Sequence, residues 1–364
     1  MSSIVLFIMV IFSIIAGIDK ILGNRHGLGE RFEEGFKSMG ALAITMVGII
    51  SLSPVISQLV MPILSPLSKL TGADPSVFVS SILATDMGGY STSAAIARSL
   101  KMAEYSGLIL ASMLGATVSF TMPIALNLVS KEDFPFFTKG VLVGIITIPI
   151  GMIVGGLVMG IPIKEIWVNL IPVIILSLLI ALGLFKFKDI TIRAFNLLGK
   201  GIMVISLLGL LLSIIDAILG IKIIPSMASF EEGITIVGKI GIVLSGAYPM
   251  FYLVQEKFKA KLSKISERLG MNQFSILGLI SSLANCVPML AIYDKMDDKG
   301  KIINGAFVVS GAFVFGGQLG FVSGISKQIV GPFILAKLSA SLSSIFLANL
   351  LLKLDKNNMN KENN

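Results

Sequence analysis

The sequence is poor in the residues that form disulfides, metal centres and soluble surfaces. It has one cysteine, Cys286, and one histidine, His26, among 364 residues. One cysteine excludes an intramolecular disulfide and a multi-cysteine metal site. One histidine leaves too few soft ligands for a catalytic zinc centre, and no cofactor is expected. Only 14% of the residues are charged, against about a quarter in soluble domains, which excludes an ordinary soluble protein.

Apolar residues fill the chain instead. They make up 54% of the sequence, and the mean hydropathy is +0.92. Apolar stretches recur along almost the whole length, each close to the ~20 residues that a helix needs to cross a bilayer. The first stretch, from Ser3 to Ala16, lacks a basic leading region and a cleavage site, so a retained helix is expected. The sequence predicts a multi-pass, all-α membrane protein in contact with the lipid bilayer.

The formal net charge of +8 does not indicate nucleic-acid binding. The basic residues stand between the apolar stretches, where membrane topology accounts for them.

Several short motifs occur twice along the chain. Phe32-Glu33-Glu34-Gly35 returns 198 positions later as Phe230-Glu231-Glu232-Gly233, and the same offset relates Gly72 to Gly270. This self-similarity predicts a duplicated unit. The expected divisions are a first repeat at 1–160, a connecting span and basic loop at 161–199, a second repeat at 200–353 and a polar tail at 354–364.

The basic residues predict how the repeats are oriented. If 75–97 and 273–293 both cross the membrane, eleven spans result, with 13 Lys and Arg inside and 15 outside. If both enter and return on one side, nine spans result, with 21 inside and 7 outside. The second arrangement obeys the positive-inside rule. It makes the two repeats inverted, with paired re-entrant or broken helices and nine to eleven membrane segments in all.

Asp86 is the only charged residue between Asp74 and Arg98. A carboxylate at membrane depth costs roughly 3 kcal/mol on insertion scales, so its presence needs a reason. Gly88 and Gly89 follow it, and each glycine costs about 1 kcal/mol relative to alanine in a helix interior. The pattern predicts a break in the helix with the carboxylate at the break.

The second repeat offers a counterpart in Asn285-Cys286-Val287-Pro288. In transporters with inverted repeats, broken helices meet near the midplane at the substrate site. Glycines free backbone carbonyls to face a cation, and proline lacks an N–H. We therefore expect both tips to suit a positively charged ligand.

Plainer interpretations stay open for each residue. Asp86 could form a structural ion pair with Lys337, and Asn285 could only join helices. Tyr90, Tyr248 and Tyr252 could form a cation-binding cage or anchor the membrane interface. Interface positions are expected for two further acids, Asp19 and Asp216.

The chain resembles the bacterial ethanolamine permease family of ethanolamine-utilisation operons, from about residue 3 to residue 352. The likeness is carried by motifs in one order: Phe32-Glu33-Glu34-Gly35, Met39-Gly40-Ala41-Leu42, Asp86-Met87-Gly88-Gly89, Tyr105-Ser106-Gly107-Leu108-Ile109-Leu110, Ile148-Pro149-Ile150-Gly151, Gly246-Ala247-Tyr248-Pro249-Met250 and Leu319-Gly320-Phe321.

The resemblance implies uptake of a small-molecule substrate, mainly protonated ethanolamine, across the bacterial cytoplasmic membrane. Asp86 would be its counter-ion. Members of the family carry an acidic residue and a histidine just before Leu-Gly-Phe, whereas this chain has Gly317-Gln318. If that pair serves proton coupling in relatives, this chain lacks it. The expected substrate-binding residues are Asp86, Gly88, Gly89, Asn285 and Gln318.

Three other functions compete with this one. A channel would use similar residues but conduct far faster, and an ion-coupled transporter could carry another cation or organic solute. An intramembrane enzyme would need a nucleophile with a base or paired carboxylates, which the isolated acids and single histidine do not supply. The sequence predicts a transporter, not an enzyme, and leaves homo-oligomerisation open.

Overall fold

The computed structural model describes residues 2–259 and 261–362, which form helices and no strands. The long helices are α1 (Ser2–Ile21), α2 (Leu28–Thr71), α7 (Phe134–Val158), α8 (Ile163–Lys186), α9 (Lys188–Leu219), α10 (Phe230–Lys259) and α16 (Val330–Glu362). The shorter ones are α3 (Pro75–Ser80), η1 (Thr85–Gly89), α4 (Tyr90–Ile96), α5 (Leu100–Glu104), η2 (Tyr105–Gly115), η3 (Thr117–Thr121), α6 (Met122–Leu128), α11 (Leu262–Leu269), α12 (Gln273–Ala284), α13 (Cys286–Ala291), η4 (Tyr293–Lys295), α14 (Asp298–Gly311) and α15 (Gly317–Ile325). The predicted all-α class is confirmed.

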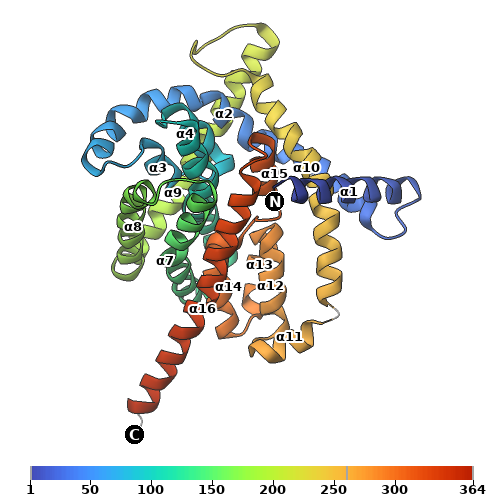
Figure 1. Cartoon of the computed structure of the whole chain (residues 1–364), viewed down its shortest axis with the longest axis vertical. Helices are drawn as coiled ribbons and strands as arrows, with labels where there is room; N and C mark the ends of the chain where they lie inside the picture. The colour runs from blue at the N-terminus through green and yellow to red at the C-terminus, as the bar shows by residue number, and fades with distance from the viewer. Residues whose placement is uncertain (1, 260, 363–364) are drawn as a thin grey trace.

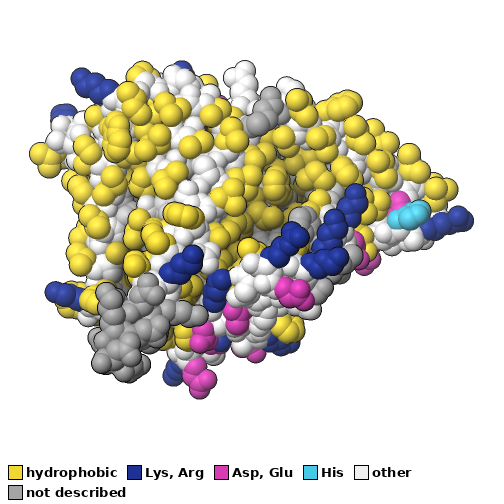
Figure 2. Space-filling model, turned by 60° about the horizontal axis from the view of Figure 1, so that its bottom comes forward, with side chains coloured by type: hydrophobic (Ala, Val, Ile, Leu, Met, Phe, Trp, Pro, Cys, Tyr) yellow, Lys and Arg dark blue, Asp and Glu magenta, His cyan; other side chains and the backbone are white. Residues whose placement is uncertain are grey.

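Eight helical stretches among the described residues are long and apolar enough to cross a membrane. They are the seven long helices and Leu100–Leu128, which joins α5, η2, η3 and α6. A further stretch, 298–325, is divided by a break between α14 and α15. The chain is therefore polytopic. On the face drawn in Figure 2, hydrophobic side chains cover most of the upper part, while most of the charged side chains lie in a band across the lower part and toward the right.

Several helices extend beyond the apolar segments that predicted them. The expected loop at 186–200 is largely helical, because α9 begins at Lys188. The expected polar tail is helical as far as Glu362. Helix α2 has 44 residues and ends where Gly72 takes a left-handed conformation, with φ 76°, and donates its N–H to Ser68 O. Residues outside the hydrocarbon can still form the backbone hydrogen bonds of a helix. A helix therefore ends at its capping residue and not at the membrane border.

Two segments fold back on themselves instead of continuing across the protein. In the first hairpin, formed by α3, η1 and α4, Asp74 Oδ2 accepts a hydrogen bond from Arg98 N at 2.9 Å. In the second, formed by α12, α13 and η4, Asn272 Nδ2 donates to Lys295 O at 2.8 Å. Each segment therefore starts and ends at the same place, as the nine-span arrangement predicts.

The two hairpins approach the centre from opposite ends of the protein. Helix α7 has 25 residues and spans roughly 37 Å at 1.5 Å per residue. Just before its start, Asp133 binds Lys301, close to the base of the second hairpin. Beyond its end, Asn169 Oδ1 accepts from Asp74 N at the base of the first hairpin. Figure 1 accordingly shows α3 and α4 in the upper half and α12 and α13 in the lower half.

Small residues let the central helices come close together. A Cβ on Gly151 of α7 would lie 2.6 Å from Ala336 O and 2.9 Å from Ala340 Cβ of α16. Without a hydrophobic force between helices in lipid, such close packing is what holds a bundle together. This contact fixes the part of α16 that carries Lys337.

Candidate functional site

The first hairpin breaks at the predicted position. Met87 has non-helical backbone angles, φ −116° and ψ 43°, and Gly88 has φ 90°. A Cβ on Gly88 would lie 2.7 Å from Ile49 Cγ1 of α2. Gly89 is helical instead, with φ −57°, and its missing Cβ lets the carbonyls of Leu83 and Ala84 approach. Of the two glycines, Gly88 alone takes a left-handed conformation.

Neighbouring elements hold this break in place. Ala84 N donates to Ser119 Oγ of η3 at 2.9 Å, and Thr85 Oγ1 donates to Gly107 O of η2 at 2.7 Å. The Tyr90 ring packs edge-on against Phe321 of α15, with centroids 6.1 Å apart. The irregular backbone is thus surrounded by protein, the condition under which it is tolerated at membrane depth.

Asp86 lies in this break, half-buried. Among the residues that the structure describes, no other residue makes a hydrogen bond or an ion pair with its carboxylate. Within the described part of the chain, the charged group closest in effect to this carboxylate is Lys337 of α16. Asp86 and Lys337 therefore interact through space and do not form the contact ion pair that the sequence left open.

Lys337 itself is completely buried. Its Nζ donates to Ser112 O of η2 at 2.6 Å and to Gln318 Oε1 of α15 at 2.8 Å. It also lies over the Phe333 ring, 5.4 Å from the centroid. Gln318 is thus placed at the centre, but its carbonyl oxygen is bound to a lysine of the chain itself.

The second hairpin breaks at Asn285, whose backbone is extended with φ −158° and ψ 133°. Its Oδ1 accepts from Val287 N at 2.9 Å and so caps α13, while the residue stays exposed. The next residue, Cys286, is buried beside Thr121 and within the electrostatic range of Lys337. Lys337 therefore lies near both broken helices, near Asp86 of one and Cys286 of the other.

Other candidates lie away from this centre. Asp19 caps the start of α2, accepting from Leu28 N and Gly29 N at 3.0 and 3.1 Å. Tyr252 lies under the Arg31 guanidinium, 5.2 Å from it. Tyr90 contacts Phe321 instead, and none of the ring pairs among the described residues joins two of Tyr90, Tyr248 and Tyr252. Asp216 is half-buried near the end of α9.

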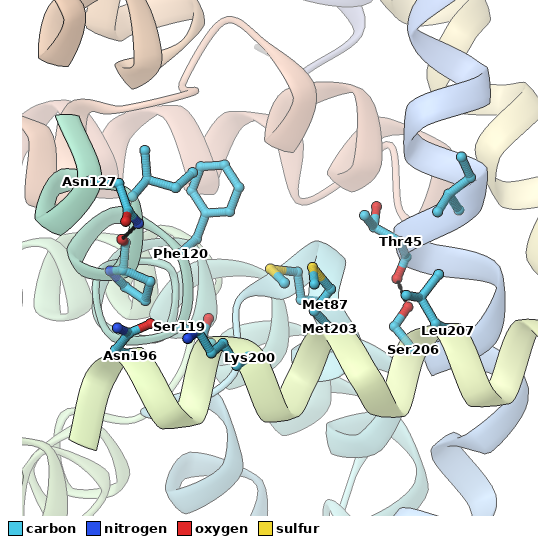
Figure 3. A pocket seen from close by; sticks show the side chains of 14 residues that line it. Thr45, Met87, Ser119, Phe120, Asn127, Asn196, Lys200, Met203, Ser206 and Leu207 are labelled. Atoms are coloured by element: carbon cyan, nitrogen blue, oxygen red, sulfur yellow. Dashed lines mark hydrogen bonds between the residues drawn. The ribbon is translucent and has the colours of Figure 1, made fainter. Parts of the chain in front are cut away.

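A cavity of about 370 Å³ lies behind the first break. Figure 3 shows Met87 and Met203 in its middle, Asn127, Asn196 and Lys200 at one end, and Thr45 and Ser206 at the other. The lining is largely apolar and carries a lysine, which disfavours a small cation there. The cavity instead gives Met87, one residue from Asp86, room to move. Sequence reasoning missed it because its walls come from five separate elements.

The chemistry available at the centre is electrostatic. Within residues 2–259 and 261–362, no group of three or more His, Cys, Asp or Glu side chains is placed to hold a metal ion. Among the described residues, the two breaks and α16 supply a carboxylate that no other residue hydrogen-bonds, a buried lysine and an exposed amide, which are groups of the kind that bind small polar ions.

Known proteins resemble this chain along its whole length. The family model described as "Ethanolamine utilisation protein, EutH" matches residues 1–351. "Probable ethanolamine permease EutH" of Listeria monocytogenes is 42% identical over 98% of this chain and 96% of the relative. The protein of that name in Escherichia coli K12 is 36% identical over 96% and 95%. "Uncharacterized protein YxeR" of Bacillus subtilis is 42% identical over 93% and 92%.

No solved structure matches the chain. The apolar helices and these relatives show a multi-pass protein of the bacterial cytoplasmic membrane that acts as a transporter and not as an enzyme. The chain belongs to the EutH family.

Proposed function

We propose that this transporter takes up ethanolamine in its protonated form, with the ammonium group bound at Asp86. The names of two relatives support the substrate. The observation that carries the site is the half-buried Asp86 carboxylate, to which no other described residue donates a hydrogen bond or pairs as an ion. A buried charge that the fold does not satisfy is costly, so a cationic ligand is its natural partner.

The other predicted residues complete the proposed site. The irregular backbone at Met87 and Gly88 would present carbonyl oxygens toward the ammonium, and the helical Gly89 would let the chain pass close to the carbonyls of Leu83 and Ala84. The exposed amide of Asn285 is suited to the substrate hydroxyl. Gln318 accepts a hydrogen bond from Lys337. We therefore propose that its main role is to hold that lysine and that contact with substrate is secondary.

The proposed mechanism is alternating access between two inverted repeats. The hairpins approach the centre from opposite ends of α7, the arrangement that inverted repeats would produce. Movement of one hairpin relative to the other would open Asp86 to each side in turn. The break beside the apolar cavity, at Met87, is the part of the first hairpin with space to shift.

Uptake by purified protein in liposomes tests this function. Asp86→Asn should lower uptake of labelled ethanolamine by roughly 100-fold, since removing one partner of a buried charge pair costs about 3 kcal/mol or more. Asp216→Asn, a change at a half-buried acid near the end of a span, is the matched control and should keep wild-type uptake. Wild-type uptake by Asp86→Asn would remove Asp86 from the site.

Two further measurements define the substrate and the class of transport. Counterflow across a series of small amines and amino alcohols should favour ethanolamine over amines that lack the hydroxyl. Single-channel currents in planar bilayers, far above the turnover of a carrier, would contradict alternating access.

A further inference from the structure

The number of hydrogen-bond acceptors around Lys337 Nζ matches the neutral form of the amine. A protonated lysine has three N–H donors, and a neutral amine has two. Two oxygens accept from Lys337 Nζ in the structure, Ser112 O at 2.6 Å and Gln318 Oε1 at 2.8 Å. A third donor would face the Phe333 ring, 5.4 Å away, or the field of Asp86. The pocket therefore holds the neutral amine fully and holds the ammonium only with help from the negative charge of Asp86.

Among the described residues, Asp86 supplies the negative charge near Lys337. The titratable groups close to Lys337 are Asp86 of η1 and the uncharged thiol of Cys286 of α13. From η2, the neighbouring titratable residue is Tyr105, whose hydroxyl donates to Met152 O. The sequence of α15 contains no ionisable residue.

The charged residues of the other helices that pack against α16 lie at a distance along their axes. Lys139 of α7 precedes Gly151, which contacts Ala336, by about three turns. On α14 the charges occupy the first turn, where Lys301 binds Asp133. Helix α1 meets α16 through Ser2, at the end opposite its Asp19 and Lys20.

We propose that Lys337 releases its proton when ethanolammonium binds at Asp86, so that each transport cycle is electrically neutral. The proposal rests on the function proposed above. In the empty site, the Asp86 carboxylate is balanced by the Lys337 ammonium. When the substrate ammonium takes over that carboxylate, Lys337 loses the one negative charge that offsets its burial. Its proton leaves to the water on the side from which the substrate entered, and the neutral amine keeps both oxygen acceptors.

The proton balance is closed over a cycle. Empty and loaded sites both carry no net charge, and Lys337 regains a proton from the opposite side after the substrate is released there. The overall exchange is one ethanolammonium inward for one proton outward, equivalent to moving neutral ethanolamine.

The test compares uptake with and without a membrane potential in liposomes that hold the full chain. A potential of about 100 mV, negative inside and set by potassium and valinomycin, would raise accumulation roughly fiftyfold if one net charge moved inward per substrate. Wild-type accumulation should change less than twofold. An outwardly acidic gradient should oppose uptake and an inwardly acidic one should drive it.

Two variants of Lys337 should make transport sensitive to the potential. Lys337→Met leaves the empty site negative and the loaded site neutral. Lys337→Arg keeps a permanent positive charge, so the loaded site is positive. Either variant then moves one net charge per cycle, whereas Lys353→Met, an exposed position on the same helix, should behave as wild type.

Substrate binding to the wild-type protein in detergent tests the proposal without any variant. Addition of ethanolamine to weakly buffered wild-type protein should release about one proton per substrate bound, recorded with a pH indicator beside calorimetric binding. Binding without proton release, or wild-type uptake that follows the potential, overturns this proposal and leaves the proposed function standing. Absence of any ethanolamine binding or uptake by wild type overturns both.

Discussion

Gly88 has the backbone conformation that the break depends on, and its φ of 90° is rarely adopted by other residues. Gly88→Ala should lower uptake at least tenfold and reduce thermal stability, because a left-handed alanine costs about 1–2 kcal/mol and its methyl group would meet Ile49 Cγ1 at 2.7 Å. Uptake and a thermal unfolding midpoint in detergent measure the two effects.

The control for that change is Gly40→Ala. Gly40 lies in α2 with no atom within 4 Å of an added Cβ, so alanine should leave uptake unchanged and raise stability slightly through its helix propensity. If Gly88→Ala behaved like Gly40→Ala, the break would not need its left-handed glycine.

Single residues were predictable where the signal was local. A lone carboxylate followed by two glycines in an apolar segment is enough to place the break at Asp86. The free-energy cost of the carboxylate and of each glycine depends only on the position of that residue. The surroundings of Lys337 were not predictable beyond the link to Asp86. Ser112 lies 225 positions from Lys337 in the sequence, and nothing in either segment indicates that its carbonyl would be the acceptor.

At the scale of elements, Asp74 closes the base of the first hairpin. Its Oδ1 accepts from Ser76 N and Ser76 Oγ at 3.0 and 2.6 Å, and its Oδ2 accepts from Arg98 N at 2.9 Å. Asp74→Ala removes both the cap of α3 and the link between the arms, so uptake should fall several-fold and stability by about 1–3 kcal/mol. Thermal unfolding and uptake measured in parallel would show this.

Asp74→Asn separates the two roles of that side chain. An amide keeps one oxygen acceptor for Ser76 but turns the atom facing Arg98 N into a donor. It should therefore be less stable than wild type and more stable than Asp74→Ala. Equal stability of all three proteins would show that the hairpin does not depend on this base.

The charge distribution predicted the two hairpins, because the positive-inside rule reports on topology directly. The lengths of the helices were harder to predict. Hydropathy marks the part of a helix in hydrocarbon, so it missed the first turns of α9 and the continuation of α16 to Glu362. It also gave no sign that η2 is wound as a π-helix over Tyr105–Gly115, where Gly107 and Gly115 lie close against Tyr90 and Leu83 of the first hairpin.

At the scale of the whole molecule, a buried ion pair between Lys301 and Asp133 joins the two halves. Lys301 Nζ lies 2.5 Å from Asp133 Oδ1, with side chains 11% and 12% exposed. Lys301→Met should destabilise the protein by about 3 kcal/mol, because it leaves a buried carboxylate without its partner. The double change Lys301→Met with Asp133→Asn should recover part of that loss. A double variant no more stable than Lys301→Met would show that the pair contributes nothing specific, and thermal unfolding of all the variants is the measurement.

The position of the two hairpins relative to the membrane gives the last prediction. The basic residues place loop 98–105 outside and loop 295–301 inside, with 21 Lys and Arg inside and 7 outside. The structure places the same two loops beyond opposite ends of α7, which at roughly 37 Å is long enough to cross the hydrocarbon. On a Cys286→Ser background, Lys101→Cys should therefore react with an impermeant maleimide in intact cells, and Asp298→Cys only after permeabilisation. Both positions are exposed, so reaction of each in permeabilised cells is the control for access. Equal labelling of the two in intact cells would contradict the inverted arrangement, and with it the alternating access proposed for Asp86.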